Sequence, residues 1–543
     1  MNTLIFKRMK KFLLMFVAVV ASLTAQAQLS NTTATWSKSM TPVTDATKLS
    51  GIYTVVAADG SVFVTGTYNQ DVTFGASSLD PDGLTPAYLA KYDANGNEKW
   101  AVGLVGNSLI TDLATDADGN VYLLGTLAED VTFESVDGNS QSVQGMKIDG
   151  TFTPERRAAF VAKYDKDGNL KVVRTIEATP DAELMASGIY SNEEVKVIPS
   201  QLAVVGSKVY LSCRYLGDVK FENVSWKGCY TGVPGIFMQD NASFGLLTLD
   251  AADLKNAKPV ATIGAMEKQS ETQSLVADFA FTVNGDCVYI SAIGDGKLAL
   301  ETAKGVDKFE MKNDNGNLAR AFILASIQGS QVVVKDYHTP TEATLAPNYS
   351  ISGMKVSEGK LYMCGTVEGH NPLVATCPEV VGAAVFAAQL NVNDLSVNWC
   401  TTDSYDEGEE KAYTQQVSCM VENKGELLLA TFVEQKSDRK VVNYLNYWFT
   451  ADGKIKPAAN DAVASMATNN NVVAVVTKAD KTTTVSMYPK KVVTGVQSIV
   501  ANPSEPTYVY NLRGQYVGRT CQGLSAGVYM VKTGKQVQKV VVK

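Results

Sequence analysis

Short apolar runs separated by Asp, Asn and Gly recur along this chain, and two stretches nearly repeat themselves. Residues 52–67 return in altered form at 110–126, and residues 87–100 return at 159–172. The runs are rich in β-branched and aromatic residues, which predicts strands. A unit of a few short strands cannot bury its apolar faces alone, so it must stack on neighbouring units.

The repeats predict an all-β fold of seven units with four strands each. The units begin near Gly51, Leu109, Val195, Ala277, Ile351, Val417 and Val463. The seventh unit supplies three strands before Pro489, and residues 33–40 read as an outer strand that precedes the first unit. If this strand pairs with the third strand of the last unit, no exposed sheet edge remains there. We therefore predict a seven-bladed β-propeller over residues 28–492, closed by its N-terminal strand.

The connections within the units differ in length. The first-to-second and third-to-fourth strand turns of the first two units carry Asp-Gly or Asn-Gly pairs, which favour tight hairpins. The second-to-third connections are long in units one to five, and in a propeller they share a face with the connections between blades. Insertions on one face often form a binding surface, so we expect one plain face and one elaborated face.

Three of the long connections begin alike, with Asp-Val-x-Phe at residues 71–74, 130–133 and 218–221. The shared start predicts that the second strand of each unit continues into a small extra hairpin. We expect the three Phe side chains to pack in the core of the protein.

The two ends of the chain differ from the repeats. Residues 1–27 combine a basic start, a short apolar run and an Ala-Gln-Ala cleavage signal, which predicts a signal peptide. We expect the protein to be exported to the cell surface or the extracellular medium, with the periplasm as the alternative. Residues 493–506 read as a linker, and residues 507–543 as a small C-terminal β-module.

Composition narrows the set of partners. The 543 residues carry a formal net charge of -8, and no long basic stripe appears, which argues against nucleic acid. After the leader, no apolar run is long enough for a transmembrane helix. The sequence indicates no cofactor, and the expected partner is a glycan or a protein.

Eight cysteines are compatible with disulfides in an exported protein. The favoured local pairs are Cys213–Cys229, Cys364–Cys377 and Cys400–Cys419. The alternative is that several are free and buried, and spacing alone does not decide between the two. The sequence contains no Cys-x-x-Cys motif, so it gives no support to a zinc site.

Known catalytic and metal motifs are incomplete in this chain. With two histidines, His338 and His370, a Ser-His-Asp triad or a His-rich metal site lacks its residues. The Asp-x-Asp-Gly-Asn pieces at 116–120 and 165–169 lack the rest of an EF-hand loop, so we interpret them as glycine turns. Residues 92–100 are similar to a tryptophan-docking repeat of quinone-dependent dehydrogenases, but the Asp-to-Gly spacing is one residue short.

Two groups of side chains are candidate binding residues. Asp403, Asp406, Glu407, Glu409 and Glu410 form an acidic run that reads as a solvated loop or, alternatively, a cation or basic-partner site. The long insertion of unit three holds the aromatic candidates and a nearby carboxylate: Trp226, Tyr230, Phe237 and Asp240. Aromatic faces beside polar groups suit a glycan or a peptide, whereas the alternative is that these residues pack the insertion together.

Residues 60–75 and 87–101 resemble the SBBP-type bacterial β-propeller repeat. Units one and two match well, unit three partly, and the later units only in the rhythm of their strands. This resemblance implies the fold and no single activity.

The tail resembles the C-terminal sorting modules of type IX secretion substrates, through residues 509–515, 524–531 and 539–543. The resemblance implies passage across the outer membrane by a secretion machinery, with removal of the module when the cargo is attached to the surface.

The sequence leaves three functional hypotheses. The leading one is a non-catalytic surface protein that binds a glycan or a protein through its elaborated face. The second is a polysaccharide hydrolase or lyase with carboxylates at the axial channel. The third is a structural or assembly scaffold.

Overall fold

The computed structural model divides the chain into two compact units, residues 1–489 and residues 490–543, which are described separately. The described residues are 34–40, 50–69, 71–74, 77–81, 86–145, 157–191, 195–233, 235–271, 274–311, 320–338, 348–369, 371, 373, 380–405, 413–423, 425–457, 462–469, 471–479, 482–489, 507–511, 516–518, 527–533 and 536–542. The predicted signal peptide (1–27) and linker (493–506) lie outside the described residues.

The larger unit is an all-β propeller, as the strand rhythm predicts. Its described strands form antiparallel meanders of four in chain order. The first meander contains β2 (Ser50–Val56), β3 (Val62–Thr67), β6 (Ala87–Tyr92) and β7 (Glu98–Val105), and the second contains β8 (Ser108–Thr115), β9 (Val121–Leu127), β12 (Ala158–Tyr164) and β13 (Leu170–Ile176). The third contains β16 (Lys196–Val205), β17 (Lys208–Leu216), β22 (Ser243–Asp250) and β23 (Lys258–Ala265), and the fourth contains β25 (Leu275–Asn284), β26 (Cys287–Thr302), β28 (Ala321–Gln328) and β29 (Gln331–His338).

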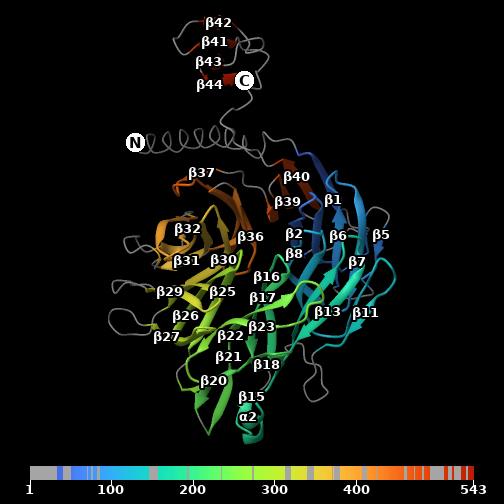
Figure 1. Cartoon of the computed structure of the whole chain (residues 1–543), viewed down its shortest axis with the longest axis vertical. Coiled ribbons are helices and arrows are strands. Elements are labelled where there is room, and N and C mark those ends of the chain that lie inside the picture. Colours follow the sequence, from blue (N-terminus) through green and yellow to red (C-terminus); the bar gives the residue numbers. More distant parts are fainter. Residues whose placement is uncertain are drawn as a thin grey trace, which may run out of the picture. The chain divides into compact units, whose positions relative to one another are not determined.

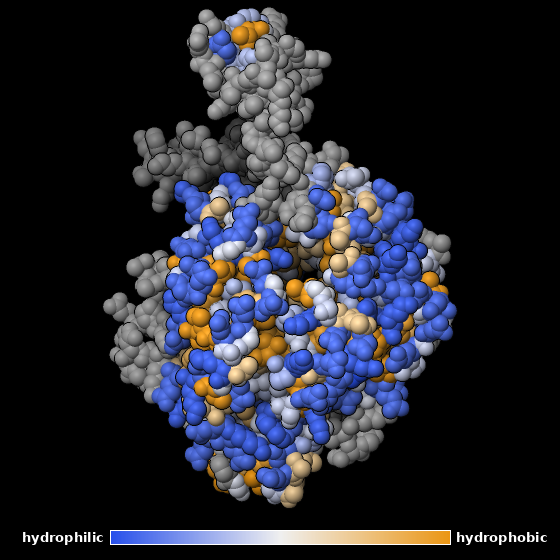
Figure 2. Space-filling view, viewed as in Figure 1, coloured by the Kyte–Doolittle hydropathy of each residue, from blue (hydrophilic) through white to orange (hydrophobic). Residues whose placement is uncertain are grey.

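Three more meanders follow in the described part of the larger unit. They are β30 (Asn348–Ser357), β31 (Lys360–Gly369), β32 (Val380–Asn391) and β33 (Val397–Ser404); β34 (Tyr413–Asn423), β35 (Glu426–Gln435), β36 (Val441–Phe449) and β37 (Ile455–Pro457); and β38 (Val463–Thr468), β39 (Val472–Ala479), β40 (Thr482–Pro489) and the N-terminal β1 (Trp36–Met40). First strands such as β2, β8, β16 and β25 lie near the middle of the view (Figure 1). Apolar side chains from neighbouring sheets interdigitate, and the outward surface is largely hydrophilic (Figure 2).

The last meander takes its fourth strand from the other end of the chain. β1 pairs antiparallel with β40, with Trp36 opposite Met487 and Met40 opposite Thr483. The first and last meanders also touch at their inner strands, where the Thr54 amide donates to Ser465 Oγ at 3.2 Å. Residues that are far apart in sequence therefore form one continuous sheet interface.

The extra hairpins after the second strands are present, and one of them extends the preceding sheet. The hairpins are β4 (Val72–Phe74) with β5 (Ser77–Leu79), β10 (Val131–Phe133) with β11 (Gln141–Val143), and β18 (Asp218–Phe221) with β19 (Val224–Trp226). Phe74, Phe133 and Phe221 are buried, which confirms their predicted place in the core. β10 pairs with β7, the outer strand of the sheet before it. The distal half of β26 likewise pairs with β23 and with β27 (Gly305–Met311).

Three tryptophans join outer strands to the next sheet, a pattern that the sequence indicated at one position only. Each indole Nε1 donates to a carbonyl in the third-to-fourth-strand turn of the following sheet: Trp36 to Ala94 at 2.9 Å, Trp100 to Lys166 at 3.1 Å and Trp399 to Ala451 at 3.0 Å. Each ring also covers the glycine of that turn, at Gly96, Gly168 and Gly453. These glycines have φ of 79° to 86°, and an added Cβ would lie 2.6–2.7 Å from the indole, so only glycine fits.

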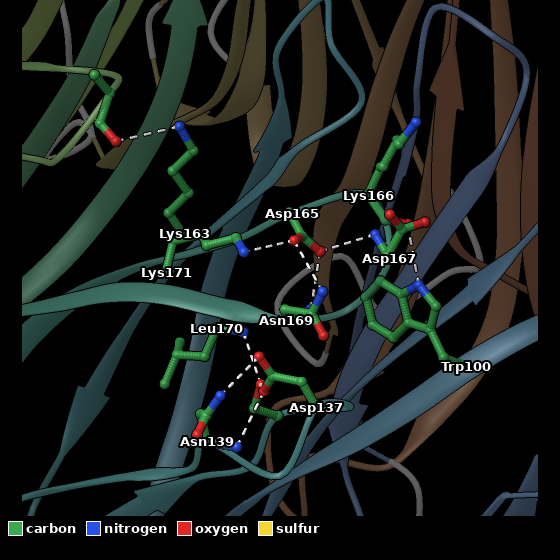
Figure 3. A network of polar contacts seen from close by, with 12 residues as sticks. Trp100, Asp137, Asn139, Lys163, Asp165, Lys166, Asp167, Asn169, Leu170 and Lys171 are labelled. Carbon is green, nitrogen blue, oxygen red and sulfur yellow. Dashed lines mark hydrogen bonds and ion pairs between the residues drawn. The ribbon is translucent and has the colours of Figure 1, made fainter.

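The Asp-x-Asp-Gly-Asn pieces are turns, as predicted, and their carboxylates accept hydrogen bonds from the turn itself. Figure 3 shows the turn at residues 165–169. Asp165 Oδ1 accepts from the amides of Asp167 and Asn169, both at 2.9 Å, while Oδ2 accepts from the Asn169 amide group and lies 2.7 Å from Lys171 Nζ. Burial raises the pKa of Asp165, but these hydrogen bonds outweigh it and lower the pKa to about 2. The turn is thus a rigid platform for the indole of Trp100.

We expect Trp36→Ala to lower the free energy of unfolding by about 3 kcal/mol, because it removes a large buried side chain. It should also expose β1 to proteases, since the indole joins this strand to the first sheet. Urea unfolding and limited proteolysis, with N-terminal fragments identified by mass, measure both effects. Trp100→Ala is the matched control, because it removes the same contact where the chain itself links the two sheets. Equal protection of β1 in both variants would contradict this role of Trp36.

Candidate interaction surface

The insertion of unit three forms a small layer of its own beside the propeller sheets. This layer contains β20 (Cys229–Val233) and β21 (Phe237–Asn241) of the insertion, together with the helix α2 (Ala182–Ser187) and β15 (Tyr190–Ser191), which precede β16, and β24 (Gln269–Ser270), which follows β23. β20 and β21 form a hairpin, flanked by β24 and β15 through parallel pairs. Leu184, Tyr230 and Met238 make up its buried core. In Figure 1 it forms the lower end of the larger unit.

Charged groups fix the helix of the insertion to the strand beside it. Asp181 accepts hydrogen bonds from the amides of Glu183 and Leu184 at the start of α2. Its other carboxylate oxygen lies 2.7 Å from Lys268 Nζ, next to β24. Burial raises the pKa of Asp181, but Lys268 and the two amides outweigh it, so the pKa lies below its usual value. The ion pair and the two amide hydrogen bonds therefore fix the start of α2 beside β24.

Three of the four candidate residues, Trp226, Tyr230 and Asp240, are buried. Trp226 is buried and stacks on Tyr215, with ring centroids 5.3 Å apart. Tyr230 is buried and makes an edge-on contact with Tyr190 at 5.5 Å. The Tyr190 hydroxyl lies 2.7 Å from a carboxylate oxygen of Asp240, to which it donates a hydrogen bond. The packing alternative of the sequence analysis therefore describes these three residues.

Phe237, the fourth candidate, lies at the exposed tip of the β20–β21 hairpin. Its side chain is 46% exposed, and the neighbouring Val233 and Ile236 are 50% and 73% exposed. The Ile236 amide donates to the Val233 carbonyl at 2.9 Å, which closes the turn. Figure 2 shows apolar atoms at this lower end of the view, among mostly hydrophilic residues. We call Val233, Ile236 and Phe237 the apolar tip.

The sequence holds a signal for the apolar tip beyond its single aromatic residue. Residues 232–238 read Gly-Val-Pro-Gly-Ile-Phe-Met and carry no charged side chain. A Pro-Gly pair marks a turn, so the apolar residues on both sides of it belong to a hairpin end rather than to a strand centre. A hairpin end projects into solvent, where large apolar side chains are seldom clustered.

None of the six described cysteines forms a disulfide. The predicted pairs Cys213–Cys229 and Cys400–Cys419 are therefore absent, and Cys377 lies outside the described residues. Cys213 lies on β17 and is buried in the propeller core, whereas Cys229 begins β20 and its thiol donates to the Ala265 carbonyl of β23 at 3.6 Å. Nearness in sequence failed as a guide because the tertiary structure gives each thiol other neighbours.

The two aspartates described on the innermost strands serve the architecture. A side-chain oxygen on the first strand of one sheet accepts the backbone amide of the next: Asp112 from Leu202 at 2.8 Å, Gln201 from Phe281 at 2.7 Å, Asp278 from Ile351 at 2.7 Å and Ser465 from Thr54 at 3.2 Å. Each acceptor directly follows a β-bulge, which turns its side chain toward the neighbouring sheet. We call these four residues the inner-strand acceptors.

Asp403, the described member of the acidic run, belongs to a sheet interface. Tyr447 forms a hydrogen bond with its carboxylate, and Gln415 Nε2 in turn lies 2.8 Å from the Tyr447 hydroxyl. Thr401, on the same side of β33, donates to the Gly453 carbonyl at 2.7 Å. The remaining acidic residues of the run, 406, 407, 409 and 410, lie outside the described residues, as does His370.

Metal and membrane features are not found in the described part of the chain. Within it, no group of three or more His, Cys, Asp and Glu side chains could hold a metal ion. The described helix is too short to cross a lipid bilayer. His338 ends β29, away from the insertion in sequence.

Comparisons with known proteins leave the function open. No family model matches the chain. An uncharacterized WD repeat-containing protein of Acanthamoeba polyphaga mimivirus is 27% identical over 156 residues, which cover 26% of this chain and 10% of that protein. The chain thus matches a small part of this relative's length.

The solved structures that match this chain include proteins with different activities. A protein of unknown function from Dyadobacter fermentans is 9% identical, with a TM-score of 0.35 over 84% of this chain and 98% of that one. Virginiamycin B lyase of Staphylococcus aureus is 9% identical, with a TM-score of 0.30 over 83% and 99%. The periplasmic gluconolactonase of Pseudomonas aeruginosa is 9% identical, with a TM-score of 0.34 over 75% and 86%. With such scores, none of them bears on the activity of this chain.

Asp112 makes the stability of the propeller depend on pH. Burial raises the pKa of its carboxyl to about 7 from the ordinary 3.8, against the effect of the Leu202 and Leu113 amides. The folded state therefore binds more protons between pH 4 and 7, and stability falls as the pH rises through that window.

We expect Asp112→Asn to gain stability relative to the natural protein between pH 5 and pH 8, because it has no carboxyl to ionise. The gain is at most roughly 3 kcal/mol, at about 1.4 kcal/mol per pH unit between the two pKa values. Urea unfolding at both pH values measures it. Asp253→Asn, at an exposed aspartate, is the control and should follow the natural protein. A constant difference between Asp112→Asn and the natural protein would contradict the expectation.

Proposed function

We propose that this chain is an exported, non-catalytic β-propeller protein of the cell surface that binds a partner protein through its apolar tip. The observation that carries the proposal is the exposure of Val233, Ile236 and Phe237 together on one hairpin end. Contiguous apolar groups on a soluble protein are typical of an interaction site. The partner is a protein with an apolar groove that accepts a hairpin end.

The rigidity of the insertion supports this function. The strands of the hairpin are paired on both sides, and Tyr230 and Met238 are buried directly beneath the tip. The Asp181–Lys268 ion pair fixes the adjoining helix. An ordered tip loses little conformational entropy on binding, which favours affinity.

A protein partner suits the tip better than a glycan does. Glycan binding uses exposed aromatic faces together with polar groups, and the candidates for those faces, Trp226 and Tyr230, are buried. The tip itself offers one exposed aromatic ring and aliphatic side chains, and residues 232–238 carry no charge. Such a surface matches an apolar protein groove.

The enzymatic hypothesis gains no supporting observation at the inner strands. A polysaccharide hydrolase of the expected kind uses a pair of carboxyl groups as acid and base or nucleophile. Asp112 and Asp278 each accept two backbone amides, one of them from the next sheet. Both carboxylates therefore have a sufficient structural role, and we assign the function to the tip.

Export and surface display are part of the proposal. The predicted signal peptide at residues 1–27 supports export, and the tail that resembles a type IX sorting module supports transfer by an outer-membrane secretion machinery. The repeats that resemble the SBBP type supply the scaffold that carries the tip.

The test begins with a photo-crosslinking amino acid at position 236 in the native host. We expect a discrete protein adduct at the surface, because Ile236 is the most exposed residue of the tip. The captured protein is then purified, and its affinity for the natural chain is measured by calorimetry. The double variant Ile236→Asp with Phe237→Asp should raise the Kd at least about tenfold, as expected at an interface hot spot.

Val306→Asp is the matched control, since Val306 is 53% exposed on a different hairpin of the same unit and should leave the Kd unchanged. Thermal unfolding checks that both variants remain folded. Adducts with lipid or glycan alone, or equal affinity of the purified partner for the double variant, would refute the proposed function.

A further inference from the structure

The C-terminal unit is a four-stranded antiparallel sheet with two different faces. Its strands are β41 (Thr507–Asn511), β42 (Tyr516–Gly518), β43 (Gly527–Thr533) and β44 (Gln536–Val542). Val509 and Val531 face each other across β41 and β43, and both are buried. Because side chains alternate along a strand, Tyr508 and Tyr510 lie on the opposite face from these valines.

The opposite face carries three tyrosines in mutual contact. The ring of Tyr516 lies 5.9 Å from that of Tyr510 and 6.1 Å from that of Tyr508, measured between centroids. Tyr516 is 54% exposed. The register places Lys532, which is exposed, directly across from Tyr508. We call Tyr508, Tyr510, Tyr516 and Lys532 the tyrosine face.

The charge of this unit is opposite to that of the propeller. Residues 490–543 carry eight of the 48 Lys and Arg residues and one of the 56 Asp and Glu residues, a net charge of +7. The other 489 residues carry 40 basic and 55 acidic side chains, a net charge of -15. A small basic unit on an acidic protein concentrates anionic ligands at its own surface.

We propose that the tyrosine face binds an anionic polysaccharide. Phenol rings present flat apolar faces on which the C–H faces of pyranose rings stack, and their hydroxyls exchange hydrogen bonds with sugar hydroxyls. Lys532 supplies a cation beside the rings for the carboxylate or sulfate of an acidic sugar, and the net charge of +7 attracts such a polymer.

The residues of the tyrosine face suit an anionic polysaccharide better than other anionic ligands. An anionic lipid surface attracts cations and takes up apolar side chains, but Val509 and Val531 of this sheet are buried on the opposite face. Single-stranded nucleic acid would also stack on the rings, so the test includes it. The inference is independent of the proposed function, since the tyrosine face and the apolar tip belong to different units.

The experiment is affinity electrophoresis of the full chain in native gels that contain polygalacturonate, with dextran as the neutral polymer. We expect retardation by polygalacturonate and none by dextran. Tyr516→Ser should weaken binding about 3- to 10-fold through the loss of a stacking ring, whereas Tyr516→Phe should change it less than about twofold. Lys532→Glu should also weaken binding and flatten its dependence on salt.

Two controls separate the tyrosine face from general charge and from misfolding. Val306→Asp, in the other unit, should bind polygalacturonate like the natural chain, and thermal unfolding should show every variant folded. The inference is overturned if no retardation occurs, if Tyr516→Ser binds as tightly as the natural chain, or if only phosphatidylglycerol vesicles or oligo-dT bind. Binding by the apolar tip is measured with a different partner, so failure of either proposal leaves the other standing.

Discussion

Two sets of hydrogen bonds join neighbouring sheets of the larger unit, one set near the middle of the propeller and the other on the outer strands. Near the middle, the inner-strand acceptors take backbone amides from the next sheet. On the outer strands, Trp36, Trp100 and Trp399 donate to the turn carbonyls of the next sheet and cover its turn glycine. Side-chain packing alone would let sheets slide, whereas these directional contacts fix how each sheet sits on the next.

The interaction surface grows out of the same architecture. In units two and four, the chain after the second strand returns to extend the outer strand of the preceding sheet. In unit three it first makes the β18–β19 hairpin and then continues into β20 and β21, which project the apolar tip. The edge strand β27 instead carries Asp307, Lys308 and Glu310, and charged edges resist pairing with other chains. The exposed apolar residues of the tip thus contrast with the charged edge strand β27 of the same unit.

The two proposed surfaces differ in chemistry, so they select different ligands. The apolar tip has no charge within residues 232–238 and gains from burial in another apolar surface. The tyrosine face combines rings, hydroxyls and a cation within a basic unit, and it suits a hydrated, charged polymer. Separate units allow each surface to act on its own ligand.

The sequence by itself determined the strands, their grouping into repeats, and the burial of Phe74, Phe133 and Phe221, because alternation and turn residues are local properties. It did not determine which side chains at the insertion are covered. Trp226 and Tyr230 were candidates either for ligand contact or for packing the insertion; the tertiary structure buries them, while Phe237 stays exposed. The docking of Trp36 and Trp399 and the separation of Cys213 from Cys229 were also decided there. The alternation of a strand fixes the face of the sheet on which a side chain lies. The residues that cover that side chain come from distant parts of the chain, so only the tertiary structure places them.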